Sequence, residues 1–183
     1  MTTYLSLGSN LGDRELNLAE AIERLGEAGI TAIRQSSLYE TEPQDIADQP
    51  WFLNLVLAAG TKSSPPDLLR AVLGVEAAMG RVRLNRRGPR LIDIDILLWG
   101  DEIFSSEELQ IPHPRMAERR FVLQPLVEIE PELRDPLTGR RFQDLLGELQ
   151  GQVVTRRTGG TKQPGSNRDS DAPERISNGL PEV

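Results

Sequence analysis

The sequence contains no cysteine, which excludes disulfide bonds, thiolate metal sites and a cysteine nucleophile. It has no apolar run approaching the roughly 20 residues of a membrane-spanning helix. The first ten residues, MTTYLSLGSN, lack the basic start and apolar core of a signal peptide. There is no GxxxxGK[ST] motif, so a P-loop phosphate site is excluded. We therefore expect a cytoplasmic protein without a membrane partner.

Basic residues are in the minority, with 21 Lys and Arg against 28 Asp and Glu and a net charge of −7. A bulk nucleic-acid binder usually carries a basic excess, so we expect no nucleic-acid partner. The hydrophobic share of 38% is enough for an ordinary core. The length of 183 residues suits one compact domain with a tail, or at most two small domains.

Hydrophobic periodicity predicts strands at 4–7, 31–39, 52–59 and 91–99, helices at 16–25, 64–80 and 115–126, and a polar hairpin at 100–109. The order strand–helix–strand–strand–helix–strand favours a ferredoxin-like α+β fold, with helices on one face of a sheet. After about Thr155 the pattern stops, and Gly, Pro, Ser, Asn and charged residues dominate. We expect a folded domain at 1–154 and a disordered tail at 155–183.

The strand at 91–99 carries the strongest chemical signal. Because alternate side chains of a strand share a face, Asp93 and Asp95 point one way and the intervening isoleucines the other. Their Cα atoms lie about 6–7 Å apart at the usual rise of a strand. Both carboxylates can therefore reach one Mg²⁺ or bridge two. The alternative is a sheet whose polar face meets solvent.

A cluster of arginines directly precedes that strand: Arg81, Arg83, Arg86, Arg87 and Arg90. Guanidinium groups bind phosphate oxygens in a bidentate way, and arginines beside Mg²⁺ are a recurring arrangement for phosphoryl transfer. The alternative is a solvated basic loop. This combination predicts an enzyme that moves a phosphoryl-type group from ATP.

Other candidate residues have equally good structural explanations. His113, the only histidine, either donates to a phosphate or is structural. Asn54 either pairs with a heterocycle or is a satisfied buried amide, and Phe52 and Phe121 either sandwich a flat ring or belong to the core. From the pattern alone, Glu76 is a solvated acid at a helix end. Gly8-Ser9-Asn10 is interpreted as a turn.

Seven segments together resemble the 6-hydroxymethyl-7,8-dihydropterin pyrophosphokinase family of folate synthesis. They are LSLGSNLGDR (5–14), SSLYETEP (36–43), QPWFLN (49–54), EAAMGRVR (76–83), GPRLIDIDILLWG (88–100), IPHPRMAERRFVLQPL (111–126) and IEPEL (129–133). The resemblance covers nearly everything before the tail. It implies a monomer with a ferredoxin-like α/β/α sandwich and a mainly antiparallel sheet. It also implies transfer of pyrophosphate from ATP to the pterin's hydroxymethyl oxygen.

The resemblance also implies roles for individual residues. Two Mg²⁺ ions would lie between Asp93 and Asp95, which with Arg81 and Arg90 form the catalytic group. The implied ATP contacts are Glu76, Arg81, Arg83, Arg86, Arg90, Ile96, His113 and Arg119. The implied pterin contacts are Thr41, Pro43, Gln44, Phe52, Asn54 and Phe121. Three positions depart from some members: Arg87 replaces a tryptophan, Leu73 a polar ATP contact and Pro114 an aromatic residue.

Two other classes compete with this interpretation. A nucleotidyltransferase also pairs a Gly-Ser turn with Asp-x-Asp, but close in sequence, whereas we expect Ser9 and Asp93 at opposite ends of the fold. An RNA-binding ferredoxin-like module would need exposed aromatic residues and a basic sheet face. Release of AMP from ATP would distinguish the pyrophosphokinase from both.

Overall fold

A computed structural model describes residues 1–43, 49–80 and 89–157. Gln44, Arg81, Arg83, Arg86 and Arg87 lie outside the described residues, as does most of the expected tail, at 158–183.

The centre of the fold is a mainly antiparallel sheet with the strand order β5-β1-β4-β3-β8, in which β2 also pairs with β4. The strands are β1 (Thr2–Ser9), β2 (Thr31–Gln35), β3 (Tyr39–Thr41), β4 (Phe52–Gly60), β5 (Asp93–Trp99) and β8 (Val154–Arg156). A separate hairpin is formed by β6 (Phe104–Ser105) and β7 (Gln110–Ile111), a little later than expected. Strand β5 lies at one end of this order and β8 at the other.

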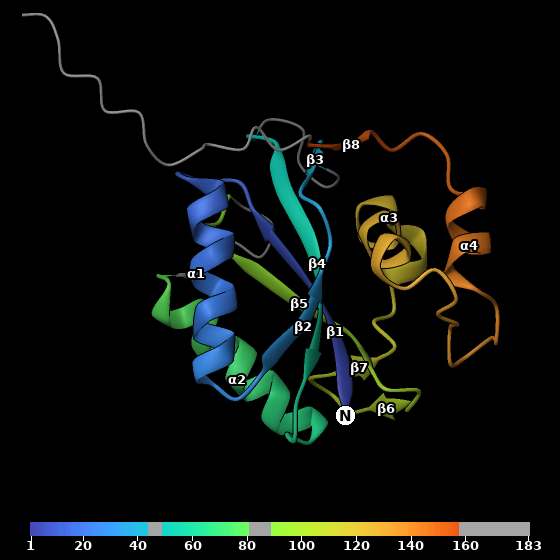
Figure 1. The fold of residues 1–183 in the computed structure, drawn as a ribbon, viewed down its shortest axis with the longest axis horizontal. Helices are drawn as coiled ribbons and strands as arrows, with labels where there is room; N and C mark the ends of the chain where they lie inside the picture. Colours follow the sequence, from blue (N-terminus) through green and yellow to red (C-terminus); the bar gives the residue numbers. More distant parts are fainter. Residues whose placement is uncertain (44–48, 81–88, 158–183) are drawn as a thin grey trace, which may run out of the picture.

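Helices cover both faces of the sheet (Figure 1). Helices α1 (Arg14–Glu27) and α2 (Pro65–Ala78) lie on one face, and α3 (Arg120–Ile129) and α4 (Phe142–Glu148) on the other. Each face has its own apolar core. The sequence-based prediction of helices on one face is therefore wrong, and the α/β/α sandwich implied by the resemblance is confirmed.

Strand β4 explains why both faces are covered. Leu53, Leu55 and Leu57 belong to the core under α1 and α2, whereas Val56 and Ala58 belong to the core under α3 and α4. Apart from Asn54, β4 is apolar from Phe52 to Ala59, as is typical of a strand that is buried on both faces. Helix α4 was not predicted from the sequence. It contributes Phe142, which is 1% exposed, to the core on its face of the sheet.

Two predicted elements are divided in the structure. The strand expected at 31–39 becomes β2 and β3, separated where the hydroxyl of Ser36 accepts a hydrogen bond from the Val56 backbone (3.0 Å). The side chain thus occupies a position in the ladder that a backbone carbonyl would otherwise fill. The helix expected at 115–126 begins as a 3₁₀ turn, Met116–Glu118, and continues as α3.

The folded region extends beyond the expected boundary at 155. Thr155 lies in the middle of β8 and pairs with Glu40 of β3. The next two residues are held as well, since Arg156 contacts Glu128 and the Arg157 backbone donates to Leu38. In the part of the chain that the structure describes, no helix is long and apolar enough to cross a membrane.

Candidate active site

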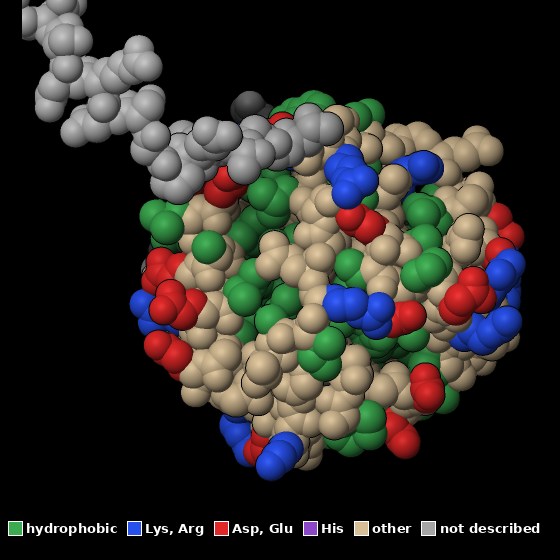
Figure 2. Space-filling model, in the orientation of Figure 1, with side chains coloured by type: hydrophobic (Ala, Val, Ile, Leu, Met, Phe, Trp, Pro, Cys, Tyr) green, Lys and Arg blue, Asp and Glu red, His purple; other side chains and the backbone are tan. Residues whose placement is uncertain are grey.

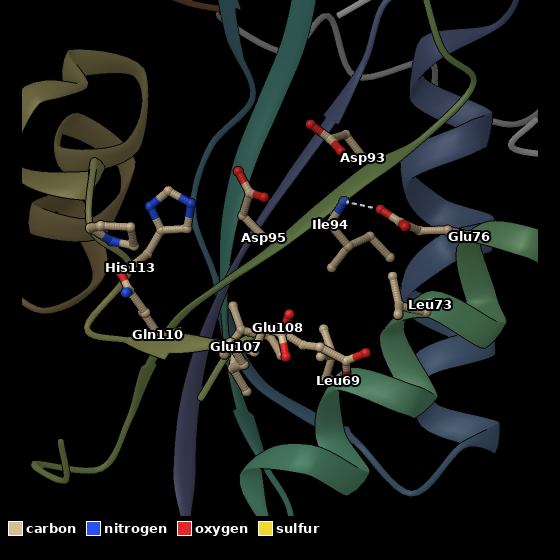
Figure 3. A pocket seen from close by; sticks show the side chains of 13 residues that line it. Leu69, Leu73, Glu76, Asp93, Ile94, Asp95, Glu107, Glu108, Gln110 and His113 are labelled. Atoms are coloured by element: carbon tan, nitrogen blue, oxygen red, sulfur yellow. Dashed lines mark hydrogen bonds between the residues drawn. The ribbon is translucent and has the colours of Figure 1, made fainter. Parts of the chain in front are cut away.

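A cavity of about 380 Å³ lies along β5, between α2 and the segment that joins β6 to β7 (Figure 3). It is lined by five residues predicted to bind ATP or metal: Glu76, Asp93, Asp95, Ile96 and His113. Leu73 and Pro114, two of the departures from the family pattern, line it too. The size is typical of a small-molecule site.

Asp93 and Asp95 share the face of the sheet that α3 covers. Asp93 pairs with Gly8 of β1, and Asp95 pairs with Ser6. The expectation that Ser9 and Asp93 lie at opposite ends of the fold is therefore wrong, because β1 and β5 are neighbours. Only their separation in sequence still argues against a nucleotidyltransferase.

Each of the two carboxylates lies beside an arginine. Asp93 Oδ2 is 2.9 Å from Arg90 Nη1, and Asp95 Oδ2 is 3.2 Å from Arg119 Nη1. The four side chains are partly exposed, and the two carboxylates line the cavity. Arg90 Nε is buried and has no hydrogen-bond partner among the described residues. A buried unpaired donor is costly, which favours an anionic oxygen as its partner in a complex.

The donor set suits a hard cation that shares its coordination with a phosphate. Two carboxylates on one strand face supply oxygen ligands, which Mg²⁺ prefers. Across residues 1–43, 49–80 and 89–157 there is no cluster of three or more His, Cys, Asp or Glu side chains arranged to hold a metal. Mg²⁺ usually binds through one or two carboxylates, with water and substrate phosphates completing its shell.

Glu76 is not the solvated acid that its position at a helix end suggested. It is 2% exposed, and its Oε1 accepts a hydrogen bond of 2.8 Å from the backbone N–H of Ile94 (Figure 3). Ile94 separates Asp93 from Asp95. Glu76 thus connects α2 to the strand that carries both carboxylates.

Ile96 offers backbone groups rather than its side chain. The N–H of Ile94 points away from β1, toward Glu76. In an antiparallel ladder backbone groups two residues apart point the same way. The N–H and C=O of Ile96 therefore face the cavity, where they can pair with the edge of a heterocycle.

His113 faces Asp95 across the cavity (Figure 3). Its Nδ1 accepts a hydrogen bond from the Arg115 backbone (3.2 Å), which places the ring proton on Nε2. Burial lowers the pKa of the imidazole, and Arg119 and Arg115 add to the shift, while the Asp95 carboxylate opposes it. The ring is accordingly a neutral Nε2–H donor near neutral pH.

Three of the predicted pterin contacts, Thr41, Phe52 and Asn54, lie together at the start of β4. Asn54 Nδ2 donates to Thr41 Oγ1 (2.7 Å), and Phe52 pairs with Thr41 in the ladder. Pro43 lies two residues after the end of β3 and is half-buried. Arg90 lies over the Phe52 ring at 5.9 Å, and Arg119 lies over the Phe121 ring of α3 at 5.6 Å. Each arginine thus links an aromatic residue to one of the two carboxylates.

Sequence reasoning underestimated the Gly8-Ser9-Asn10 turn. A Cβ atom at Gly8 would lie 2.5 Å from Asn54 Oδ1, so only glycine allows the amide this close. Asn10 is 2% exposed and hydrogen-bonds to both Arg90 and Pro50. No local signal marks this role of Asn10, because its partner Arg90 lies 80 residues away in sequence.

A family model for 7,8-dihydro-6-hydroxymethylpterin-pyrophosphokinase (HPPK) matches residues 4–131. The 2-amino-4-hydroxy-6-hydroxymethyldihydropteridine pyrophosphokinase of Methylorubrum extorquens is 44% identical over 154 residues, which cover 84% of this chain and 96% of that protein. The folic acid synthesis protein fol1 of Schizosaccharomyces pombe is 45% identical over 152 residues. That match covers 82% of this chain but only 21% of the relative, so the chain spans a small part of that longer protein.

Solved structures show the same fold. The crystal structure of Plasmodium falciparum HPPK-DHPS wild type with pteroate matches with a TM-score of 0.65 and 18% sequence identity. The match covers 80% of this chain and 42% of that one.

Proposed function

This chain belongs to the 7,8-dihydro-6-hydroxymethylpterin-pyrophosphokinase family, and from that we propose that it transfers pyrophosphate from ATP to 6-hydroxymethyl-7,8-dihydropterin. In this reaction the hydroxymethyl oxygen attacks the β-phosphorus and loses its proton. The bond between the β-phosphorus and the oxygen shared with the α-phosphate breaks, and AMP leaves. The products are AMP and the pterin pyrophosphate.

One observation carries the proposal. A pair of carboxylates, each beside an arginine, lies between a cavity along β5 and an amide–aromatic group on β4. Gly8 of β1 pairs with Asp93 on one side and with Asn54 on the other, so only one strand separates the two groups. This places a phosphate-binding region next to a region suited to a flat heterocycle.

We propose that Asp93 and Asp95 hold two Mg²⁺ ions, which when bound neutralise charge on the phosphates. Arg90 and Arg119 then exchange their carboxylate contacts for phosphate oxygens, and Arg90 Nε gains an acceptor. His113 donates a hydrogen bond from its Nε2–H to the triphosphate. Once the triphosphate is bound these donors are in place, so they stabilise the charge that develops during the chemical step without further reorganisation.

For the heterocycles, we propose that adenine pairs with the Ile96 backbone and the pterin with Asn54. Thr41 fixes the Asn54 amide through one N–H bond, leaving further hydrogen-bonding capacity on the amide for the pterin edge. Phe52 and Phe121 supply the rings that stack on the pterin. Glu76 supports the nucleotide site through β5.

The test is an incubation with ATP, Mg²⁺ and 6-hydroxymethyl-7,8-dihydropterin, followed by chromatography of nucleotides and pterins. We expect AMP and pterin pyrophosphate in equal amounts, with no product when EDTA is added. Release of pyrophosphate would instead indicate nucleotidyl transfer, and release of ADP would indicate single phosphoryl transfer. Either result would refute the proposal. Two features of the structure argue against RNA binding. Helices α3 and α4 cover the sheet face that such a module would expose. Basic side chains on the molecular face in Figure 2 lie beside acidic ones.

A further inference from the structure

Asn10, at the end of β1, connects two segments that are far apart in sequence. Its backbone N–H donates to Arg90 O (3.2 Å), and its Oδ1 accepts from the Arg90 backbone N–H (2.8 Å). On the other side its Nδ2 donates to Gln49 Oε1 and to Pro50 O, each at 3.2 Å. The Asn10 side chain does not line the cavity, but it is 2% exposed and both of its amide atoms make hydrogen bonds.

Both segments lead directly to groups of the candidate active site. The Arg90 guanidinium is 2.9 Å from Asp93 and lies over the Phe52 ring. Pro50 is two residues before Phe52 and is joined to it through Trp51. The carbonyl of Trp51 is in turn held by Arg14 Nη1 (2.8 Å). The Asn10 amide thus contacts the backbone of Arg90, whose guanidinium lies on the proposed phosphate side. It also contacts the segment that leads into β4 and Phe52, on the proposed pterin side.

The oxygen and the nitrogen of the Asn10 amide bond to different segments. Oδ1 is the acceptor for the Arg90 segment, and Nδ2 is the donor for the Gln49–Pro50 segment. A residue that served only the turn would bond within it. Asn17 does this, because its Nδ2 donates to Ser9 Oγ and Leu11 O and reaches neither segment.

We infer that Asn10 is a positioning residue that fixes Arg90 relative to the pterin-binding end of β4. Its amide oxygen positions the Arg90 segment, on the phosphate side. Its amide nitrogen positions the Gln49–Pro50 segment, on the pterin side. This role rests on the proposed function. Positioning errors of about 1 Å can cost about 10²-fold in rate, so a residue outside the cavity can govern turnover.

Two substitutions separate the two ends. Asn10→Asp keeps the acceptor for the Arg90 N–H but removes the donor to Pro50 O. We expect it to raise the dissociation constant for the pterin, measured by calorimetry without nucleotide, by about tenfold, and to leave kcat within about threefold. Asn10→Ala loses both ends, and we expect the same weakening of pterin binding together with a drop in kcat of about 10²-fold.

Asn17→Ala is the matched control, because it loosens the same turn without touching either segment. We expect it to change kcat and the pterin dissociation constant by less than about threefold. The inference is overturned if Asn10→Ala leaves both quantities near the wild-type values, if Asn10→Asp lowers kcat as much as Asn10→Ala, or if Asn17→Ala reproduces the losses. Should Asn10→Ala not fold, as judged by circular dichroism, the pterin affinities of Asn10→Asp and Asn17→Ala decide: equal affinities overturn the inference.

The wild-type protein distinguishes this failure from failure of the proposed function. If it forms no pterin pyrophosphate, the proposed function is refuted. If it turns over but the variants show none of the expected pattern, only the role of Asn10 is refuted.

Discussion

The carboxylate of Glu76 on α2 accepts a hydrogen bond of 2.8 Å from the backbone N–H of Ile94, the residue between Asp93 and Asp95. Because Glu76 is 2% exposed, this contact is shielded from water. It fixes β5 against α2 at the point from which both carboxylates project.

The first prediction concerns Glu76. Glu76→Ala leaves the Ile94 N–H buried and unpaired, so we expect a loss of about 1–3 kcal/mol in the free energy of unfolding and a fall in kcat. Glu76→Gln retains an oxygen acceptor and should recover most of the stability. Urea denaturation and steady-state kinetics measure both effects. If Glu76→Gln changes only the KM for ATP, Glu76 acts by direct contact with the nucleotide instead.

The second prediction concerns the proposed metal ligands. Asp95→Asn should lower turnover by about 10³-fold or more, because metal ions supply several kcal/mol of charge stabilisation during phosphoryl transfer. Stability should change by less than about 1 kcal/mol, since the Asp95–Arg119 pair is partly exposed. Direct Mn²⁺ titration in the presence of an ATP analogue should show lost metal affinity.

A suitable control for that experiment is Asp144→Asn, which also removes one carboxylate from an arginine pair, on α4. It should retain normal turnover and metal affinity. An Asp95→Asn protein with most of its activity would contradict the metal assignment.

Asp93 and Asp95 were also the part of the site most accessible from sequence. Period-two alternation placed them on one face and Ile94 and Ile96 on the other, and the structure agrees, with both isoleucines in the core under α1 and α2. The start of the helix predicted at 64–80 was also close to the observed one, because Ser64 caps α2 by accepting a hydrogen bond from the Asp67 N–H, a contact within four residues of sequence. Such local patterns need no knowledge of tertiary contacts.

What sequence reasoning missed depends on contacts between distant segments. Glu76 was taken as solvated because its partner, Ile94, is 18 residues away on another element. Asn10 looked like an ordinary turn residue because Arg90 is 80 residues away. Helix α4 is only seven residues long, so it offers barely two turns of periodicity for detection.

The third prediction separates charge from geometry at Arg90. Arg90→Ala should lower kcat by about 10²-fold, the scale of one lost preorganised donor. Arg90→Lys keeps the charge but not the guanidinium fork, so it should remain well below wild type. Arg24→Ala, which breaks an exposed pair with Glu20 on α1, should have no effect. Full activity in Arg90→Lys would show that charge alone suffices.

The fourth prediction concerns the C-terminal boundary. A chain ending at Arg157 should keep the wild-type melting temperature and turnover. A chain ending at Val153 loses β8 together with the Arg156–Glu128 and Arg157–Glu15 contacts. We expect it to lose at least about 1 kcal/mol of stability, or a few degrees in melting temperature by calorimetry. Equal melting temperatures for the two truncated chains would mean that β8 adds nothing to stability.

The fifth prediction follows from a cluster in which Glu128 accepts hydrogen bonds from Ser37, Tyr39 and Arg156. Burial and the hydrogen bond to Glu128 raise the pKa of the Tyr39 hydroxyl from 10.0 to about 12. A raised folded-state pKa means that the stabilisation is complete below pH 10 and is lost as the pH rises through about 12.

Tyr39→Phe should therefore be less stable than wild type at pH 8, by about 1.5–3 kcal/mol for a hydrogen bond to a charged group. Between pH 10 and 12 the wild-type protein should lose this advantage, so the two unfolding free energies converge.

Ser37→Ala removes another hydrogen bond to Glu128 but no titrating group, and its deficit in unfolding free energy should stay constant over the same pH range. Denaturant unfolding of the three proteins at pH 8, 10, 11 and 12 gives the comparison. Because Tyr4 also has a raised pKa and is present in all three, its contribution cancels. A deficit for Tyr39→Phe that stays unchanged from pH 8 to 12 would show that the Tyr39 hydroxyl does not couple to folding through its proton.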